Sequence, residues 1–181
     1  MNAATFLGVS LFIACAPLAR AKGPELVKDR SWVTYRLVHP LHEIEATSKD
    51  VVYAIDAVEK TKEIRHVEAD VDVMTFDSGN SNRDSHAMEV IDALDYPDVS
   101  FSSTAIRTQG DSIDVDGMLQ FHGVTRQVEM LGTASWQNDT LVVHGGFNLS
   151  LTAFHIERPS LLMIPVEDTL HFAVNATFNL K

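Results

Sequence analysis

Histidine can act as a metal ligand or as a general acid or base, and this sequence contains eight histidines. His155 and Glu157 fall on the same face of an extended segment, and neutral imidazole is a common metal ligand. This pair could hold a metal ion if His144 or His171 came close. A zinc site, however, needs three or four ligands that converge at about 2.0–2.2 Å, and the spacing of these histidines predicts no such convergence. We therefore predict no metal site and keep a histidine-dependent metal or redox-cofactor binding protein as the alternative function.

Three further histidines are predicted to be structural or isolated. His122 lies in a predicted hairpin turn, where we expect it to have a conformational role. His39 and His42 stand on either side of Pro40-Leu41, a spacing too irregular to place both rings on one strand face.

Catalytic motifs are absent from the sequence. There is no Gly-x-Ser-x-Gly, no phosphate-binding glycine-rich loop and no His-Glu-x-x-His. Two carboxylate pairs, Asp70/Asp72 and Asp114/Asp116, alternate with apolar residues and should therefore point to solvent. The sequence thus predicts a protein that is not an enzyme and has no catalytic residues, and an enzyme acting on a lipid ranks third among the hypotheses.

Two arginines are the candidates for a cationic contact with a ligand. Arg126 shares the parity of Val124 and Val128, which would direct it toward the interior near the end of a hairpin. Arg158 lies directly before Pro159 in an apolar segment. Each guanidinium could bind the polar head of an amphiphile, or could extend to water at the rim of the fold. Both interpretations stay open.

Alternation of apolar and polar residues dominates the chain after residue 30 and indicates antiparallel strands. It is clearest in residues 67–73, 113–121, 147–151 and 170–180. About eight to ten such runs fit an all-β barrel or sandwich. Short turns between them, such as His122-Gly123, favour an up-and-down order of strands over helical crossovers.

Two segments interrupt this alternation. Residues 84–94 predict one short helix, with Asp84 as its cap and Pro97 preventing its continuation. Residues 152–168 form an apolar connection with two prolines, and a long connection of this kind is often functional. Exposed Leu161 and Leu162 would otherwise be a liability, so we expect this segment to be a portal or a partner surface.

The beginning of the chain predicts export. Residues 6–18 are almost entirely apolar and are followed by Ala19-Arg20-Ala21, the pattern of a secretory signal peptide. We therefore predict a signal peptide at 1–21, one domain at 22–181, and a periplasmic or secreted location. Cleavage there would remove Cys15, whose lipidation is the competing interpretation of this segment.

The charge of the chain limits its partners. With 14 basic and 25 acidic residues the net charge is −11, which repels phosphate backbones and argues against nucleic acid. The apolar run near the start is shorter than the roughly 20 residues that a membrane-spanning helix needs, so we expect no membrane span. A homodimer is compatible with the sequence.

Several motifs in series resemble the YceI-like family. Residues 75–80 (TFDSGN) and 83–86 (RDSH) are similar to its "tGN..RD.H" segment. Residues 96–104 (YPDVSFSST) and 115–126 (VDGMLQFHGVTR) resemble its "yP.i.F.St" and "v.G.L.i.GvTr" patterns. The resemblance runs from about Trp32 to the C-terminus.

This resemblance implies a lipocalin-like antiparallel barrel of about eight strands with one short helix. It also implies a tunnel for a polyisoprenoid, an isoprenoid quinone or a fatty-acid-like lipid, often in the periplasm, with no other cofactor. Besides Arg126 and Arg158, the predicted ligand contacts are the inward apolar residues Val71, Val73, Phe101, Leu119, Phe147, Leu149, Phe172 and Phe178. Which of them contact a ligand and which only fill the core stays open.

Overall fold

The computed structural model describes residues 23–181. The predicted signal peptide at 1–21, with Cys15, lies outside the described residues. No helix in the described part of the chain has the length and apolar character that crossing a bilayer requires.

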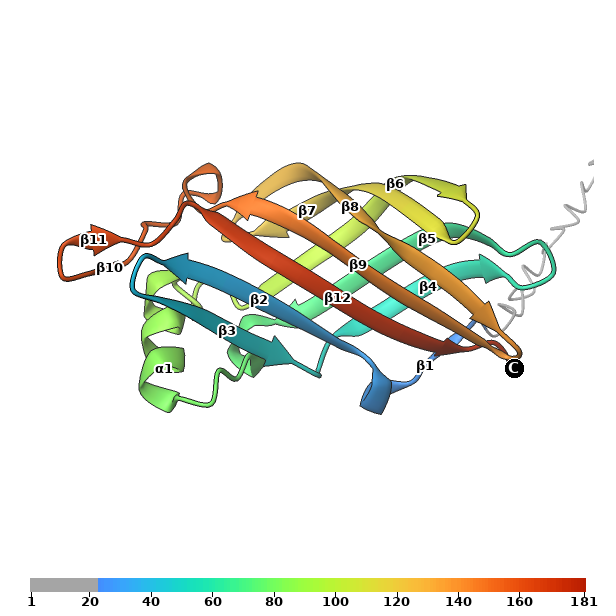
Figure 1. Cartoon of the computed structure of the whole chain (residues 1–181), viewed down its shortest axis with the longest axis horizontal. Coiled ribbons are helices and arrows are strands. Elements are labelled where there is room, and N and C mark those ends of the chain that lie inside the picture. The colour runs from blue at the N-terminus through green and yellow to red at the C-terminus, as the bar shows by residue number, and fades with distance from the viewer. Residues whose placement is uncertain (1–22) are drawn as a thin grey trace, which may run out of the picture.

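Ten strands form one antiparallel sheet that curls around its own inner face (Figure 1). In chain order they are β1 (Glu25–Leu26), β2 (Trp32–His39), β3 (His42–Ser48), β4 (Val52–Val58), β5 (Glu63–Asp72), β6 (Asp98–Gln109), β7 (Ser112–Phe121), β8 (Val124–Gln137), β9 (Thr140–Ser150) and β12 (Thr169–Asn179). Their spatial order is β3-β2-β12-β9-β8-β7-β6-β5-β4, with β1 beside β12. The predicted all-β barrel is therefore confirmed, with more strands than the eight expected.

Short elements complete the chain. They are the 3₁₀ helices η1 (Lys28–Arg30), η2 (Val73–Thr75) and η3 (Thr152–Phe154), the helix α1 (Ser81–Val90), and a separate hairpin of β10 (Ser160–Leu161) and β11 (Ile164–Pro165). The predicted long connection at 152–168 is thus folded into η3 and a projecting hairpin. Its two ends meet where the Leu151 amide donates to the Asp168 carbonyl at 2.8 Å.

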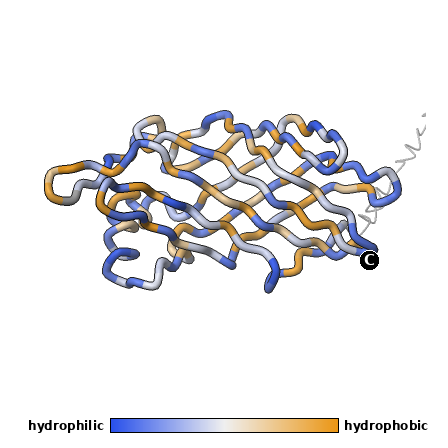
Figure 2. The backbone as a smooth tube through the Cα atoms, in the orientation of Figure 1, coloured by the Kyte–Doolittle hydropathy of each residue, from blue (hydrophilic) through white to orange (hydrophobic). Residues whose placement is uncertain are grey.

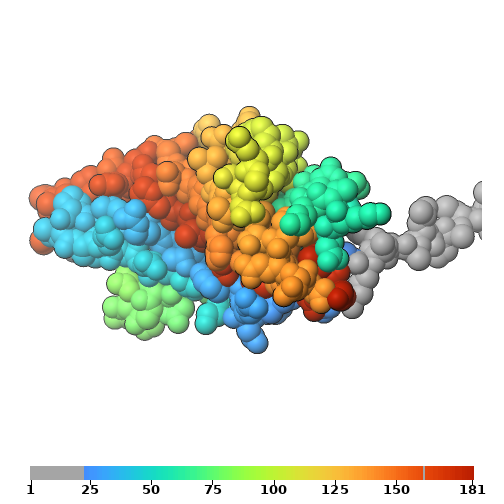
Figure 3. All heavy atoms as spheres, turned by 45° about the vertical axis from the view of Figure 1, so that its right-hand side comes forward, coloured from blue at the N-terminus to red at the C-terminus, as the bar shows by residue number. Residues whose placement is uncertain are grey.

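The sheet has a seam between its two ends. No ladder joins β3 to β4 within residues 23–181, although only residues 49–51 separate them in sequence. The segment after β5 covers the seam instead, because Thr47 of β3 and Asp77 exchange two backbone hydrogen bonds of 3.0 and 3.1 Å. Figure 3 shows α1, in green, lying against the blue strands on this side. The helix therefore takes the place of further strand pairing.

Alternating side chains give the sheet an apolar inner face, visible as the alternating colours along the strands in Figure 2. The buried residues gather in two main clusters inside the barrel. The cluster beside α1 includes Leu119, Phe154 and Leu170, and the cluster at the opposite end includes Val115 and Phe178. Each apolar side chain removed from water stabilises the fold by about 1.5–3 kcal/mol.

The start of α1 differs from the prediction. The helix begins at Ser81, not at residue 84, and the side chain of Asn80 caps it by accepting from the Arg83 amide at 3.2 Å. Asp84 does not cap the helix, because its carboxylate accepts from the Ser78 amide at 3.2 Å. Gly79, at φ 75°, redirects the chain about one helical turn before Asp84, so Asn80 becomes the N-cap residue.

Two hairpins fix the positions of the structural histidines. The predicted turn at His122-Gly123 is confirmed, and both residues have positive φ, as a tight two-residue turn requires. The interpretation of His39 and His42 was wrong. Pro40-Leu41 forms a turn, so the two histidines pair across β2 and β3 with ring centroids 5.1 Å apart. Proline fixes φ near the value that a turn needs at its first position, and the sequence analysis missed this.

A cluster of glycines marks a close approach between β8 and β9. A Cβ on Gly132 would lie 2.1 Å from the His144 carbonyl oxygen and 2.8 Å from the Gly145 Cα, which are backbone atoms. On Gly145, its cross-strand partner, a Cβ would meet the Met130 sulfur at 3.0 Å, and that flexible side chain can move.

We predict that Gly132→Ala lowers the free energy of unfolding by about 2–4 kcal/mol. The matched change Gly145→Ala should lower it by less than about 1 kcal/mol, as urea unfolding would measure. Equal effects of the two changes would contradict this account.

Candidate functional site

The interior of the barrel contains an apolar cavity of about 220 Å³. Its walls come from β2 to β9, β12 and α1, so it is enclosed by the whole sheet and by the helix on the seam. The predicted wall residues all line it, namely Val71, Val73, Phe101, Leu119, Phe147, Leu149, Phe172 and Phe178. Their contact with a ligand stays a prediction.

Aromatic rings make up much of the wall. Phe147 and Phe172 face each other across β9 and β12, and their rings stack with centroids 4.8 Å apart and planes 6° from parallel. Tyr35 continues the row, with its ring 6.4 Å from Phe172 and 5.3 Å from Phe76. These rings are rigid, so they maintain an open interior that aliphatic side chains could fill by changing rotamers.

Phe101 lies flat against the wall because of a glycine. A Cβ on Gly117 would be 2.3 Å from two ring atoms of Phe101, so the ring occupies the space that a side chain would take. Phe101 also packs against both main clusters of the core. The absence of a side chain at Gly117 therefore lets the Phe101 ring lie close to the backbone of β7.

Polar groups gather at the end of the cavity beside α1. Arg83 is half-buried and His86 is exposed, and both line the cavity. The Arg83 guanidinium is held in place because it donates to the Ser78 hydroxyl at 2.8 Å and to the Ser78 carbonyl at 2.6 Å. Because the lining here includes an exposed residue, the cavity reaches the surface at this end.

Two tyrosines, together with Asp70 of β5, are the other polar residues of the lining. Neither phenol donates to another described residue, although both are largely buried and a buried phenol usually finds a partner. Burial raises the pKa of Tyr35, the Asp84 carboxylate raises it further, and the Arg83 guanidinium opposes part of this rise. Burial alone raises the pKa of Tyr53. Both hydroxyls are therefore neutral donors available to a bound molecule.

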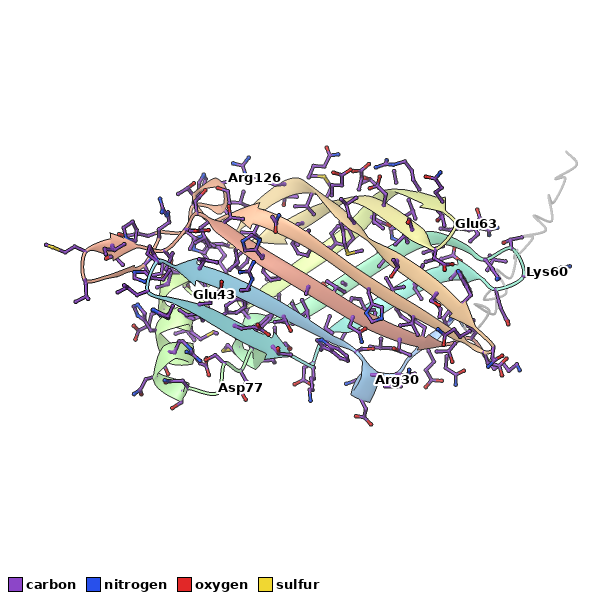
Figure 4. All side chains as sticks on the ribbon, viewed as in Figure 1. Arg30, Glu43, Lys60, Glu63, Asp77 and Arg126 are labelled. Carbon is purple, nitrogen blue, oxygen red and sulfur yellow. The ribbon has the colours of Figure 1, made fainter. Side chains whose placement is uncertain are left out.

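The two predicted arginines lie away from the cavity. Arg126 is exposed, points away from the barrel in Figure 4, and donates through Nε to the Ala153 carbonyl at 2.6 Å. Arg158 donates through Nε to the Val166 carbonyl at 2.8 Å. Of the two interpretations left open for Arg126, its contacts agree with the rim position, because it pairs with Leu119 but its guanidinium extends to a carbonyl of η3. Both side chains hold the connection at 152–168 in shape.

Sequence analysis missed Arg83 as a residue of the site. It was quoted only as part of a motif, and its helix was predicted to begin at the next residue. The available signal was spacing, since Arg83, Ala87 and Val90 share one face of a helix that begins earlier. All three line the cavity.

The histidines do not form a metal site in the described residues. Residues 23–181 contain no group of three or more His, Cys, Asp or Glu side chains arranged to hold a metal ion. His155 and His144 are exposed, and His171 forms a 2.7 Å hydrogen bond with Asn148.

A serine, a histidine and a glutamate do come together on β5 and β6. The Ser103 hydroxyl lies 3.0 Å from His66 Nδ1, and His66 Nε2 lies 3.3 Å from Glu68. The arrangement resembles a hydrolase triad, but the serine is buried at a β-bulge and does not line the cavity. Its oxygen accepts from the Val67 amide at 2.9 Å, replacing a ladder bond that the bulge interrupts. The hydroxyl therefore completes the sheet.

Comparisons with known proteins agree on one family. The model of the YceI-like domain matches residues 25–178. Protein YceI of Salmonella newport (strain SL254) is 26% identical over 114 residues, which cover 61% of this chain. The aligned part spans 60% of the length of that relative.

Solved structures share the fold at low sequence identity. BcnA of Burkholderia cenocepacia superimposes with a TM-score of 0.76 at 19% identity, covering 84% of this chain and 99% of its own. The Campylobacter jejuni YCEI protein gives 0.64 at 14% identity, with 97% and 99% covered. A polyisoprenoid binding domain from Saccharophagus degradans gives 0.65 at 9% identity, with 87% and 98% covered.

The buried phenols predict a loss of stability at alkaline pH. A tyrosine whose pKa is raised by folding stabilises the fold fully below its unfolded pKa near 10.0 and progressively less above it. We predict that the free energy of unfolding falls above pH 10 by up to about 1.4 kcal/mol per pH unit for each such tyrosine. Tyr53→Phe should remove its share of this slope, whereas the exposed Tyr96→Phe should not. Denaturant unfolding from pH 8 to 11.5 tests this, and a slope unchanged by Tyr53→Phe would contradict it.

Proposed function

Because this chain belongs to the YceI-like family, whose domain matches residues 25–178, we propose that it binds one long apolar amphiphile inside its barrel and carries or stores it unchanged. The observation that supports this most directly is the shape and chemistry of the cavity. Its lining is predominantly apolar, Arg83 and His86 lie together at the end beside α1, and Asp70 of β5 also belongs to the lining.

The size of the cavity suits a chain-like tail. One water needs about 10–15 Å³ of such space, so 220 Å³ corresponds to roughly 15–22 positions of that size in a connected interior. A tail of ten carbons would gain roughly 8 kcal/mol from burial before the cost of association, because each methylene contributes about 0.8 kcal/mol. Micromolar binding corresponds to about 8 kcal/mol net, so after the cost of association a longer tail or polar contacts must supply the remainder.

The polar groups beside α1 suit the head of the same molecule. Arg83 is held by Ser78 and so meets a ligand with its side chain already ordered, which lowers the entropy cost of binding. Its guanidinium could donate to a phosphate, carboxylate or carbonyl oxygen, and the Tyr35 hydroxyl could donate to the same group. Arg83 and Tyr35 thus replace Arg126 and Arg158 as the proposed head contacts.

An isoprenoid is the ligand class that we favour. The similar domain from Saccharophagus degradans is named for polyisoprenoid binding, and the stacked rings of Phe147 and Phe172 offer flat surfaces to a methyl-branched chain. An isoprenoid quinone and a fatty acid share the same apolar tail and are the competing ligands. Mass analysis distinguishes the three.

We also propose that the protein works outside the cytoplasm. The apolar run at 6–18, followed by Ala19-Arg20-Ala21, supports this proposal. A water-filled compartment between membranes is where a sparingly soluble lipid needs a protein that shields its tail. Sequencing the N-terminus of the protein isolated from its host tests cleavage after Ala21.

Native mass spectrometry of the protein purified from its own host is the first test of the binding function. We expect a one-to-one adduct that organic extraction releases as an apolar molecule with a polar end. A bare protein mass, persisting after incubation with isoprenoid quinones and fatty acids, would reject the proposal.

A cavity-filling substitution tests the location of the ligand. Ala69 of β5 lines the cavity, whereas Ala173 of β12 is exposed on the outer face. We predict that Ala69→Trp weakens ligand binding by at least about tenfold, because the indole would occupy the space of the tail. Ala173→Trp is the matched control and should bind normally. Thermal unfolding confirms that both variants fold, and normal loading of a folded Ala69→Trp variant would place the ligand elsewhere.

A further inference from the structure

Two hairpin turns at one end of the barrel expose apolar side chains. In the β10–β11 turn, Leu162 and Met163 are 76% and 96% exposed, and Ile164 is 40% exposed. In the β2–β3 turn, Leu41 is 60% exposed. We call these four residues the apolar tips. Figures 1 and 3 show the two turns side by side, and the β10–β11 turn is the apolar projection in Figure 2.

The β10–β11 turn holds its apolar residues in an unfavourable backbone conformation. Leu162 and Met163 have φ of 53° and 67°, the left-handed region that normally takes asparagine or glycine. Asn-Gly at these positions would relieve both the strain and the exposure of large apolar groups to water. The chain therefore carries two unfavourable features in one turn, and nothing inside residues 23–181 packs on Met163 to compensate for them.

The turns are nevertheless fixed to the barrel. His39, which is buried, accepts from the Leu41 amide through Nδ1 at 3.1 Å, so its Nε2 donates to the Ile164 carbonyl at 3.0 Å. The Glu167 amide donates to the Val38 carbonyl at 2.8 Å. His39 thus ties one hairpin to the other, and the apolar tips form one projecting unit.

This unit continues directly from the wall of the cavity. Pro159 and Ile156, next to the β10–β11 hairpin, line the cavity, and so do Leu37 and Ile44 of the β2–β3 hairpin. The polar end of the cavity at α1 lies at the same end of the molecule (Figure 1).

We propose that the apolar tips insert into the surface of a lipid bilayer and dock the barrel there. A stable protein interface buries about 800 Å² on each partner, and four side chains on two narrow turns provide too little area for a second copy of the chain. A bilayer accepts narrow apolar projections to a depth of about 5–10 Å without requiring a complementary shape. Residues 159–166 carry no charge, so their insertion desolvates no ion.

The charge of the chain selects the kind of bilayer. With a net charge of −11, the protein is repelled by an anionic surface, so docking rests on the apolar contact and suits zwitterionic lipids. Docking would place the end of the cavity that carries Arg83 and His86 toward the lipid surface. Docking goes beyond ligand binding in the barrel and does not require it.

Flotation with phosphatidylcholine vesicles tests the docking with the protein as its host produces it. We expect the wild-type protein to float with the vesicles and the double substitution Leu162→Ser/Met163→Ser to reduce this partitioning by at least about tenfold. The matched control is Leu131→Ser/Met74→Ser, which removes one exposed leucine and one exposed methionine elsewhere on the barrel. It should float like the wild type. Leu162→Phe/Met163→Phe should restore flotation, because it keeps the tips apolar.

Three results would overturn the docking. They are a wild-type protein that stays out of the vesicle fraction, a tip variant that partitions like the control, and partitioning that rises when a fifth of the lipid is made anionic. Sedimentation without vesicles adds a fourth, since a dimer that only the tip variant loses would identify a second copy as the partner. Native mass spectrometry of the same samples separates the two proposals. A protein that floats with the vesicles but carries no lipid adduct would reject only the binding function.

Discussion

The unpaired edges of β3 and β4 are the constraint on which the rest of the structure depends. A sheet of this size presents backbone donors and acceptors along each edge, and these groups need partners or water. The chain satisfies part of β3 with Asp77, and the Ser48 hydroxyl bonds that of Thr75 at 2.6 Å. Figure 4 shows Asp77 between β3 and the start of α1. The segment that bridges the seam therefore also fixes the helix against the barrel.

Covering the seam with a helix has a consequence for the interior. A further strand would complete a wall of side chains that alternate strictly inward and outward, whereas α1 presents a mixed face of Arg83, Ala87 and Val90. Arg83 can then border a predominantly apolar cavity at the end beside α1. The stacked and tilted rings of Tyr35, Phe147 and Phe172 hold the remainder open. The polarity of the cavity from one end to the other thus follows from how the sheet is closed.

Sequence periodicity predicted which side chains of a strand face inward, but it missed the contacts between elements that are distant in sequence. The inward positions of Phe101, Leu149 and Phe178 followed from alternation, because side chains on a pleated strand have only two faces to choose from. Arg126 has the inward parity, yet its long side chain reaches a carbonyl of η3, which is 27 residues away in sequence. Arg83 enters the site only because α1 packs on the seam, and helical spacing can place it on a face with Ala87 and Val90 but cannot show where that face packs. Some features were predictable from residues close together in the sequence. Pro40-Leu41, for example, could have been identified as the turn that pairs His39 with His42.

The position of β12 between β2 and β9 ties the two ends of the chain together. The Arg30 carbonyl accepts from Asn175 at 2.7 Å and from Thr177 at 3.1 Å, and the Thr177 amide donates to the Ser31 hydroxyl at 3.0 Å. Contacts between residues so distant in sequence close slowly, because the loop entropy is lost before the contacts form. During synthesis the β2–β3 hairpin has no other strand beside it in the sheet until β12 has emerged, so β2 joins β9 only through the last strand. The cavity, whose wall includes β12, therefore cannot be completed before the last strand has been made.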